Sequence, residues 1–435
     1  MSIKAGVEIR DISPKQGLPL GGYPHYPRHN TGVHDPLCAC CIYLTDGVKE
    51  IAVVAMDLLF FSKKYVTAVR DRVFAECGIA PESIMISCEH THSGPWAAGG
   101  IDDETLYDNE DMGYVNELLN KLVSAIVQAK SGAFDAQVAV TKGYCGPEQG
   151  IGGNRRDPKG PADTDVCTIA VADMNDVVRG IYVNYALHPT VIHEDSTVVT
   201  ADFPGYTRTY LKEKYPQASL CYAQGASGNQ SSRYFRQGQD FNEAKRIGEQ
   251  IGKAAQKAIE SAQFSTDMKI DAQSETMKIK TRHIPPMDQL KADVAKFGKI
   301  YEDMKAADAP YLDVQNANLK HLGAEDFLGL TKANAKGDLR LLNEEDPAEL
   351  QVLSIGEHRI VSMPGEVFVD FALEIKNRSP YANTFVTTLA GGCLPGYVCT
   401  KESYALGGYE TGASLLDPSF GYDMVETIID MLTEK

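Results

Sequence analysis

Residues 51–95, IAVVAMDLLFFSKKYVTAVRDRVFAECGIAPESIMISCEHTHSGP, contain the pattern that decides the fold class. Residues 51–57 are almost entirely apolar, which is typical of a strand buried on both faces. Ser62 can cap a helix that continues to about Cys77, because apolar residues recur along one of its faces. Residues 84–88 form a second apolar run. A strand, a helix and another strand in this order indicate α/β packing.

The same alternation continues along the chain. We therefore predict an α/β fold with a mixed β-sheet core flanked by helices, forming one compact domain over residues 1–435. A charged stretch at 286–346 predicts a helical excursion or lid. Strands are expected at 137–141, 167–172, 181–186, 220–223, 350–354 and 359–362, and helices at 114–129, 242–262 and from about Met424.

Composition excludes several classes of function. The 435 residues include 42 Lys and Arg against 59 Asp and Glu, a formal charge of −17. Such a chain repels phosphate backbones, so we expect no nucleic-acid partner. No apolar run approaches the roughly 20 residues of a membrane-spanning helix, so no integral membrane association is expected. The first residues do not resemble an export signal, which predicts a cytoplasmic protein.

The ten cysteines lie mostly in apolar or strand-like runs. This pattern is typical of buried small hydrophobic residues in a reducing compartment. A metal ligand is therefore sought among His, Glu, Asp and Tyr.

Three histidines follow strand-like runs. His90 and His92 come directly after residues 84–88 and would point to the same side of an extended segment. His188 follows residues 181–186 and is fixed by Pro189. The carboxyl ends of strands are where α/β proteins place ligands. Each histidine can also have a purely structural role, as a hydrogen-bonded pair or as a donor to a carbonyl at a turn.

Other candidate residues have equally plain structural alternatives. Glu366 follows a Pro-Gly turn and can bind a ligand or stabilise a helix N-terminus. Tyr397 and Tyr409 lie in a glycine-rich stretch, where phenols either pack or approach a bound ion. Arg155 can bind a carboxylate, polarise a carbonyl or form a surface ion pair. The small-residue turn at 225–231 can expose a serine, yet it does not match the GxSxG motif.

Taken together, these segments resemble the catalytic domain of the neutral/alkaline non-lysosomal ceramidase family. The most specific part is the block His90-Thr-His-Ser-Gly-Pro95 with a later His188-Pro-Thr190. The resemblance also rests on Gly22-Tyr23, Gly32-Val-His34-Asp35, Asn154-Arg155, Gly365-Glu366, Tyr397, Thr400-x-Glu-x-Tyr404 and Tyr409-Glu410, which occur in the family's order.

The resemblance implies the identities of the site residues. One zinc ion would be held by His90, His188, Glu366 and Tyr397. His92 would stand beside the metal, Arg155 matches an active-site arginine, and Tyr409 matches a tyrosine near the substrate. The family's Gly-Asp-x-Ser-Pro-Asn motif aligns with residues 228–233 and points to Ser231 rather than Ser227, although its Asp, Pro and Asn are replaced here.

The resemblance predicts a zinc-dependent hydrolase that cleaves an amide bond. Zinc lowers the pKa of a bound water to about 7, so we expect hydroxide to attack an amide or ester carbonyl. Ser231, Tyr409 or Arg155 would stabilise the oxyanion, and His92 would pass a proton to the leaving group. A serine-acyl route is less favoured, because no neighbouring Asp and His complete a triad.

The expected substrate differs from ceramide. Ceramidases carry an export signal and a C-terminal immunoglobulin-like domain, neither of which is expected here, and the negative charge disfavours anionic membranes. A soluble, smaller amide is therefore predicted as the small-molecule substrate, with a role in lipid metabolism left open. The alternatives are a zinc-dependent lactonase, esterase or isomerase, or a non-catalytic binding protein of the same fold. No oligomeric state is predicted.

Overall fold

The fold is built on an eight-stranded mixed sheet. The computed structural model describes residues 2–23, 25–97, 111–336 and 344–433. The strand order is β13-β11-β10-β8-β1-β5-β6-β7, with β6/β7 and β11/β13 parallel and the other pairs antiparallel. The strands are β1 (Lys4–Asp11), β5 (Cys38–Thr45), β6 (Glu50–Met56), β7 (Ile84–Cys88), β8 (Phe134–Tyr144), β10 (Asp165–Asp173), β11 (Val178–Tyr185) and β13 (Ser219–Gln224).

A second sheet packs face to face against the first. Its strand order is β15-β16-β17-β19, and it consists of β15 (Ile270–Met277), β16 (Ala348–Ile355), β17 (His358–Met363) and β19 (Asn383–Thr388). Leu353, Ile360 and Phe385 of this sheet share one buried cluster with Val53 and Tyr182 of the large sheet. The core between the sheets is thus formed by inward-facing side chains of both, as in a β-sandwich.

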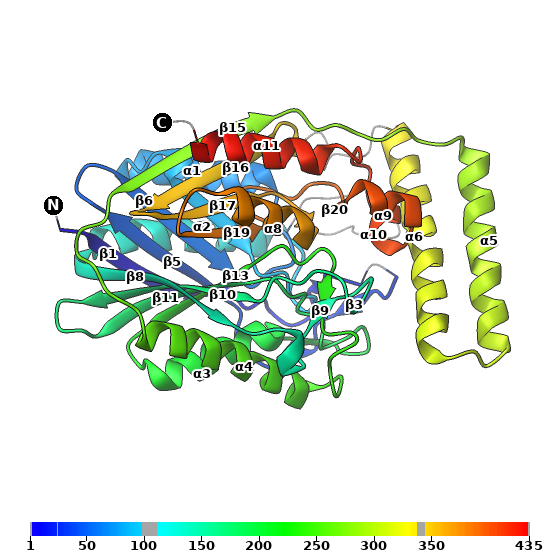
Figure 1. The fold of residues 1–435 in the computed structure, drawn as a ribbon, viewed down its shortest axis with the longest axis horizontal. Coiled ribbons are helices and arrows are strands. Elements are labelled where there is room, and N and C mark those ends of the chain that lie inside the picture. The colour runs from blue at the N-terminus through cyan, green and yellow to red at the C-terminus, as the bar shows by residue number, and fades with distance from the viewer. Residues whose placement is uncertain (1, 24, 98–110, 337–343, 434–435) are drawn as a thin grey trace.

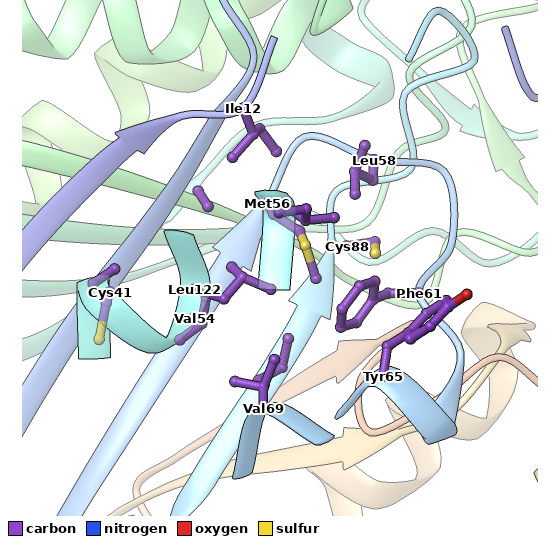
Figure 2. Close-up of a cluster of buried hydrophobic side chains, with 14 of the residues drawn as sticks. Ile12, Cys41, Val54, Met56, Leu58, Phe61, Tyr65, Val69, Cys88 and Leu122 are labelled. Carbon is purple, nitrogen blue, oxygen red and sulfur yellow. The ribbon is translucent and has the colours of Figure 1, made fainter. Parts of the chain in front are cut away.

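Helices cover the outer faces of both sheets (Figure 1). On the large sheet, α1 (Lys63–Cys77) and α2 (Met112–Ser131) cover one half, and α3 (Asp202–Lys214) and α4 (Phe241–Glu260) cover the other. On the small sheet lie α8 (Val369–Arg378) and α11 (Phe420–Thr433). Figure 2 shows how Val54 and Met56 of β6 meet Val69 of α1 and Leu122 of α2. The layers are helix, sheet, sheet and helix.

A pair of long helices lies at one end of the molecule. The antiparallel helices α5 (Met287–Ala306) and α6 (Tyr311–Lys336) stand apart from the sheets at this end, beside α9 (Lys401–Leu406) and α10 (Tyr409–Gly412) (Figure 1). The short elements are β2 (Pro19–Leu20), β3 (Arg28–His29), β4 (Gly32–Val33), η1 (Pro81–Ser83), η2 (Pro147–Gln149), β9 (Gly153–Asn154), β12 (Val198–Val199), β14 (Gln230–Ser231), β18 (Glu366–Val367) and β20 (Tyr397–Val398).

The predicted fold class is confirmed. Mixed sheets flanked by helices form the core, and each strand expected from an apolar run coincides with an observed strand. The helical excursion expected at 286–346 corresponds to α5 and α6, although its residues 337–343 lie outside the described part. The helix whose N-terminus Glu366 was expected to precede is α8, which begins at Val369. All ten cysteines are free, and only Cys38 and Cys77 are more than slightly exposed. No helix among the described residues is long and apolar enough to cross a membrane.

Candidate active site

His90 lies two residues beyond the end of β7. Its backbone has a φ of 78° and its N–H donates to the Leu58 carbonyl, so the chain leaves the strand in a fixed direction. The ring atom Nδ1 is 3.0 Å from the Leu59 carbonyl oxygen. Because a carbonyl only accepts, Nδ1 carries the proton and Nε2 of the neutral ring has a free lone pair.

His188 is held in the same way from the other half of the large sheet. It follows β11, its backbone N–H donates to the Gln230 carbonyl, and Nδ1 is 2.8 Å from the Ser227 carbonyl oxygen. Its Nε2 is therefore also unprotonated in the neutral ring. The two Nε2 atoms, on His90 and His188, face each other at 3.0 Å.

Glu366 completes this arrangement from β18. Its Oε2 lies 3.2 Å from Nε2 of His90 and 3.2 Å from Nε2 of His188. The oxygen is buried and has no hydrogen-bond donor. Burial would raise the pKa of Glu366, but the neighbouring His90 and His188 bring it well below its usual range. This lowering requires positive charge next to the carboxylate, which protonated imidazoles or a bound cation would supply.

These three atoms fit a tetrahedral metal ion. Two lone pairs and a carboxylate oxygen at 3.0–3.2 Å repel one another unless a cation lies between them. Zinc bonds of about 2.0–2.1 Å place neighbouring ligand atoms about 3.3 Å apart, close to the observed separations. The carbonyls that fix both Nδ1 atoms are the usual outer partners of metal-binding histidines. The donor set of this chain therefore suits zinc.

Tyr397 is positioned beside Glu366 by a strand pairing. β18 and β20 run parallel, with Glu366 opposite Tyr397. The phenol is buried and lines the same cavity as the histidines. Burial, reinforced by the charge of Glu366, raises the pKa of Tyr397 well above its usual value. A phenol at this place can supply a fourth ligand.

His92 stands next to the three converging atoms rather than among them. Its ring lies 4.9 Å from the His90 ring and 4.9 Å from the Tyr23 ring, centroid to centroid. The ligand nitrogens of His90, His92 and His188 all lie within 4.8 Å of one another, a looser set than the one that includes Glu366. Both ring nitrogens of His92 are buried without a hydrogen-bond partner. Burial, followed by the neighbouring His90 and His188, brings the pKa of His92 well below its usual value.

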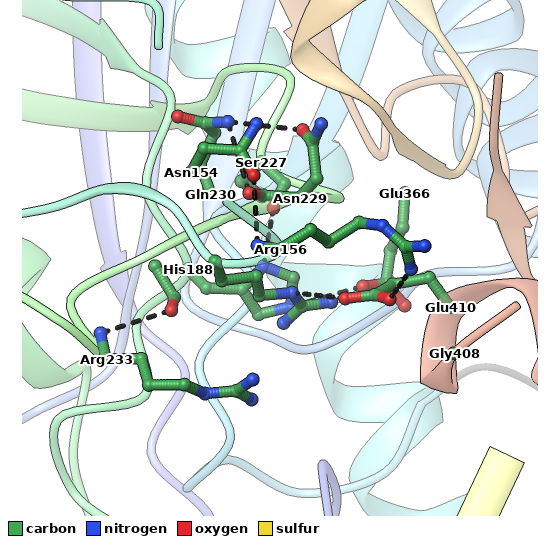
Figure 3. A network of polar contacts seen from close by, with 12 residues as sticks. Asn154, Arg156, His188, Ser227, Asn229, Gln230, Arg233, Glu366, Gly408 and Glu410 are labelled. Atoms are coloured by element: carbon green, nitrogen blue, oxygen red, sulfur yellow. Dashed lines mark hydrogen bonds and ion pairs between the residues drawn. The ribbon is translucent and has the colours of Figure 1, made fainter. Parts of the chain in front are cut away.

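Arg155 and Arg156 share one buried carboxylate (Figure 3). Nε of Arg155 donates to Oε1 of Glu410 at 2.8 Å, and Nη1 of Arg156 donates to Oε2 of Glu410 at 2.6 Å. The Arg155 guanidinium also lies 5.4 Å from the centre of the Tyr397 ring. Its Nη2 is buried with no partner. Arg155 thus retains a free donor beside the converging ligands.

The two candidate serines occupy different positions. Ser231 lines the cavity, and its Oγ accepts the backbone N–H of Arg233 at 3.2 Å. Ser227 supports His188 through its backbone carbonyl and does not line the cavity. Tyr409 lies at the start of α10 on the cavity wall, with its ring 6.0 Å from that of Tyr397.

One cavity of about 460 Å³ is lined by His90, His92, Arg155, Ser231, Glu366, Tyr397 and Tyr409. Its lining is divided by chemistry. One part is apolar and comes from the loops after β6 and β7, the 394–395 turn and α6, with Leu59, Phe60, Trp96, Leu312, Leu319, Leu322, Leu330, Leu394 and Pro395. The other is polar and includes Arg155, Ser231, Arg233 and Arg236. The volume lies in the lower part of the range of about 300–1,000 Å³ that is typical of small-molecule sites.

Comparison with solved structures gives a match over almost the whole chain. The crystal structure of neutral ceramidase from Pseudomonas aeruginosa aligns with a TM-score of 0.76 over 99% of this chain and 74% of that one, at 16% identity. The chain has the neutral ceramidase fold. A structure described as ceramidase complexed with C2 aligns equally well, with a TM-score of 0.76 at 15% identity. The resemblance to the ceramidase family is thus confirmed at the level of fold.

Sequence comparison points to the same relatives. The curated neutral ceramidase of Drosophila pseudoobscura pseudoobscura is 24% identical over 234 residues, which is 49% of this chain. The matched region covers 32% of that relative, so the likeness in sequence extends over only about a third of its length. No family model matches the sequence.

The structure brings the site residues expected from the sequence together: all but His188 line the cavity, and His188 reaches the same point through its Nε2 atom. His90, His188, Glu366 and Tyr397 converge, and His92, Arg155, Ser231 and Tyr409 surround them. Two charged residues of the site were not predicted, Glu410 and Arg233. The Arg155-Arg156 pair signals a need for an acidic partner, but no pattern identifies Glu410 as that partner.

Proposed function

We propose that this protein is a zinc-dependent hydrolase that cleaves the amide bond of a small N-acyl compound. The observation that carries the proposal is the convergence of Nε2 of His90, Nε2 of His188 and Oε2 of Glu366 at 3.0–3.2 Å. Without a cation this arrangement is unfavourable, and with one it is a catalytic site with room for a further ligand. Kinship with proteins named neutral ceramidase supports amide hydrolysis as the reaction.

The proposed ligands are His90, His188, Glu366 and Tyr397. When bound, zinc supplies Lewis acidity, which polarises a carbonyl and lowers the pKa of water toward 7. The surrounding carbonyls of Leu59 and Ser227 keep both imidazoles in the ligating tautomer.

The cationic and hydroxyl groups of the cavity wall orient the amide carbonyl. Arg155 is fixed by Glu410 and keeps Nη2 free, so it can donate to the carbonyl oxygen as negative charge develops there. Ser231 and Tyr409 present hydroxyl groups to the same cavity. Because Glu410 and the strand pairs hold these donors before substrate arrives, little reorganisation is needed during the reaction.

His92 is placed to move a proton. Neither ring nitrogen is occupied by a protein partner, and both are shielded from water. The ring can therefore take the proton that the attacking water loses and give it to the leaving nitrogen of the substrate as the C–N bond breaks. Among the described residues no imidazole lies within hydrogen-bonding distance of the Ser231 hydroxyl, so we assign Ser231 to carbonyl binding rather than nucleophilic attack.

The cavity favours a substrate smaller than ceramide. Its apolar wall accepts an acyl chain, while its moderate volume and polar wall suit a compact polar group on the other side of the amide. We therefore keep ceramide as a test substrate and expect smaller N-acyl compounds to be hydrolysed faster.

Removal of single ligands tests the metal assignment. His90→Ala and His188→Ala each take away a donor that no nearby side chain replaces, so both variants should lose stoichiometric zinc. Their activity should fall by more than about 100-fold. Metal analysis and turnover of an N-acyl substrate provide the measurements. His283→Ala, which removes an exposed histidine, should retain both zinc and activity.

Two outcomes would contradict the proposal. One is a purified protein that neither contains zinc nor gains activity when zinc is added, which would favour a non-catalytic binding protein. The other is a substrate preference that differs from the proposed one, measured with short-chain fluorescent ceramide, N-acyl compounds and sugar lactones. Faster release of fatty acid from ceramide would refute the smaller substrate, and turnover of lactones alone would favour the lactonase alternative.

A further inference from the structure

Arg233 carries a charge that the protein leaves unpaired. The residue is half-buried in the cavity wall, two positions after Ser231. Among the residues that the structure describes, its guanidinium has no hydrogen-bond acceptor and no carboxylate within ion-pair distance. In Figure 3 the one interaction drawn for Arg233 belongs to its backbone nitrogen, which donates to Oγ of Ser231.

Glu410, the buried carboxylate beside Arg155, is already occupied by other arginines. Both carboxylate oxygens of Glu410 accept from arginines, one from Arg155 and one from Arg156. Arg236, further along the same wall, donates to the Thr190 carbonyl, His193 and Gln239, all uncharged acceptors in the neutral imidazole form. The other carboxylates that line the cavity, Glu194, Asp326 and Glu366, lie against histidines, so none of the described carboxylates pairs with Arg233.

A half-buried cation without a protein partner is costly to retain. Burial, with the repulsion of Arg155, lowers the pKa of Arg233, which indicates that the folded protein disfavours its charge. Nη2 of Arg155, on the same wall, is a second buried donor without a partner. Groups left in this state commonly gain their partners from a ligand, because a carboxylate matches the planar donor edge of a guanidinium.

We propose that Arg233, together with one of the two N–H groups on Nη2 of Arg155, forms a subsite for an anionic group of the substrate, while the other N–H remains for the amide carbonyl. The inference rests on the proposed function and specifies its substrate class. Because Ser231 and Arg155 also face the reacting carbonyl, the anion belongs close to the scissile bond. The apolar wall that includes α6 takes the acyl chain, and the arginines take the opposite end. The substrate class is therefore an N-acyl amino acid, whose carboxylate lies near the amide nitrogen.

Matched substrates isolate this subsite. N-acylglycines and N-acylethanolamines of equal acyl length share the amide and differ in having a carboxylate or a hydroxyl group. The zinc-loaded wild-type protein should hydrolyse the N-acylglycine with the higher kcat/KM. Arg233→Gln should lower kcat/KM for the N-acylglycine by about 10- to 100-fold and leave the N-acylethanolamine nearly unchanged. Arg233→Lys keeps the charge but not the planar donor edge. Its kcat/KM for the N-acylglycine should therefore lie between the values of the wild-type protein and of Arg233→Gln.

Two controls separate the effect of losing the Arg233 charge from the effect of a folding defect. Arg179→Gln removes an arginine whose side chain is 42% exposed and which pairs with Asp173, so it should keep the wild-type preference. Thermal unfolding checks that Arg233→Gln is folded. The change in the ratio of the two kcat/KM values is the decisive readout, because a general loss of structure lowers both values together.

The outcomes distinguish the subsite from the proposed function. Equal hydrolysis of both substrates, unchanged by Arg233→Gln, would overturn the subsite and leave amide hydrolysis standing. Calorimetric binding of N-acylglycine that depends on Arg233, without turnover of any amide, would support the subsite and overturn the hydrolase. N-acylethanolamine phosphate serves as a third probe. A preference for it over N-acylglycine would overturn the carboxylate assignment.

Discussion

A Cβ atom on Gly22 would lie 2.5 Å from both Cβ and Cγ of His92. Gly22 also has a φ of 104°, in the region that favours glycine. The absent side chain thus leaves the space in which the His92 ring packs. Among the single residues of the site, this glycine sets the position of the proposed proton donor without touching any proposed ligand.

Gly22→Ala should therefore separate catalysis from metal binding. The added methyl group displaces His92, and a displacement of about 1 Å in an active site can cost about 100-fold in rate. Zinc content should stay stoichiometric, because His90, His188 and Glu366 are not contacted. Gly17→Ala is the matched control, since Gly17 has a φ of 98° and a Cβ atom added there would meet nothing within 4 Å. Equal activity in the two variants would show that contact with His92 is unimportant.

Residues at strand ends were the easiest to predict. His90 and His188 follow apolar runs, and the strand ends bring them together as expected. Arg233 and Glu410 could not be predicted in the same way, because their importance comes from which charges are paired in three dimensions. A sequence reveals an arginine, but it does not reveal whether a carboxylate far along the chain, such as Glu410, is already occupied by other partners.

At the scale of elements, α6 and α10 approach each other through glycines. A Cβ atom on Gly323 of α6 would lie 2.9 Å from Cα of Tyr409, and one on Gly412 of α10 would lie 2.3 Å from the Gly323 carbonyl oxygen. The backbones of α6 and α10 are thus in direct contact next to Tyr409, which lines the cavity. The helix pair α5 and α6 is in this way tied to the candidate active site.

Gly323→Ala should disturb substrate binding. The methyl group forces α6 away from α10, at a cost of about 1–3 kcal/mol, and shifts Tyr409 with the apolar residues of α6. We expect KM for an N-acyl substrate to rise several-fold. Gly329→Ala lies in the same helix with nothing within 4 Å and should stabilise α6 by up to about 1 kcal/mol. Steady-state kinetics and thermal unfolding compare the two, and an unchanged KM in Gly323→Ala would contradict the expected coupling.

Elements without an apolar run escaped prediction. β15 has the sequence IDAQSETM, and only Ile270 in it is fully buried. The strand lies at the edge of its sheet, so it lacks the apolar pattern of a central strand. α3 contains Pro204 in its first turn, where proline is tolerated because its missing N–H has no helical partner. By contrast, β6 and β7 are buried throughout and were clear from their composition.

For the whole molecule, Asp202 links stability to pH. Its buried carboxyl accepts the N–H groups of Val191, Ile192 and Phe203 and so holds the loop that follows His188. Burial raises the pKa of Asp202 from 3.8 to about 6, even though these hydrogen bonds lower it. A raised pKa means that the contribution of this group is fully present below pH 3.8 and is lost as the pH rises through 6.

The free energy of unfolding should record this loss. Between pH 4 and 7 the contribution of Asp202 falls by about 2 kcal/mol. Asp202→Asn removes the titration and should flatten the pH dependence by that amount, while any lost hydrogen bond adds a constant offset. Chemical denaturation at several pH values measures the slope. Asp135→Asn, at an exposed carboxylate, should keep the wild-type slope, and an equally steep slope in Asp202→Asn would exclude Asp202 as its source.

The face-to-face packing of two sheets could not be inferred from the chain alone. Strands such as β6 and β16 are buried on both sides, so their apolar residues show no alternation that would distinguish a helix neighbour from a sheet neighbour. The sequence therefore predicts the strands and the helical cover, whereas the division into two sheets depends on long-range pairing between distant segments.

The order in which the proposed ligands occur along the chain has a consequence for biosynthesis. His90 and His188 come from the large sheet, while Glu366 and Tyr397 come from segments that follow strands of the small sheet. A ribosome must therefore translate beyond residue 397 before the full ligand set exists. Metal capture then follows the docking of the two sheets, because loop closure between such distant segments is a late step of folding. Zinc would join a nearly finished protein and would not act as the nucleus around which it folds.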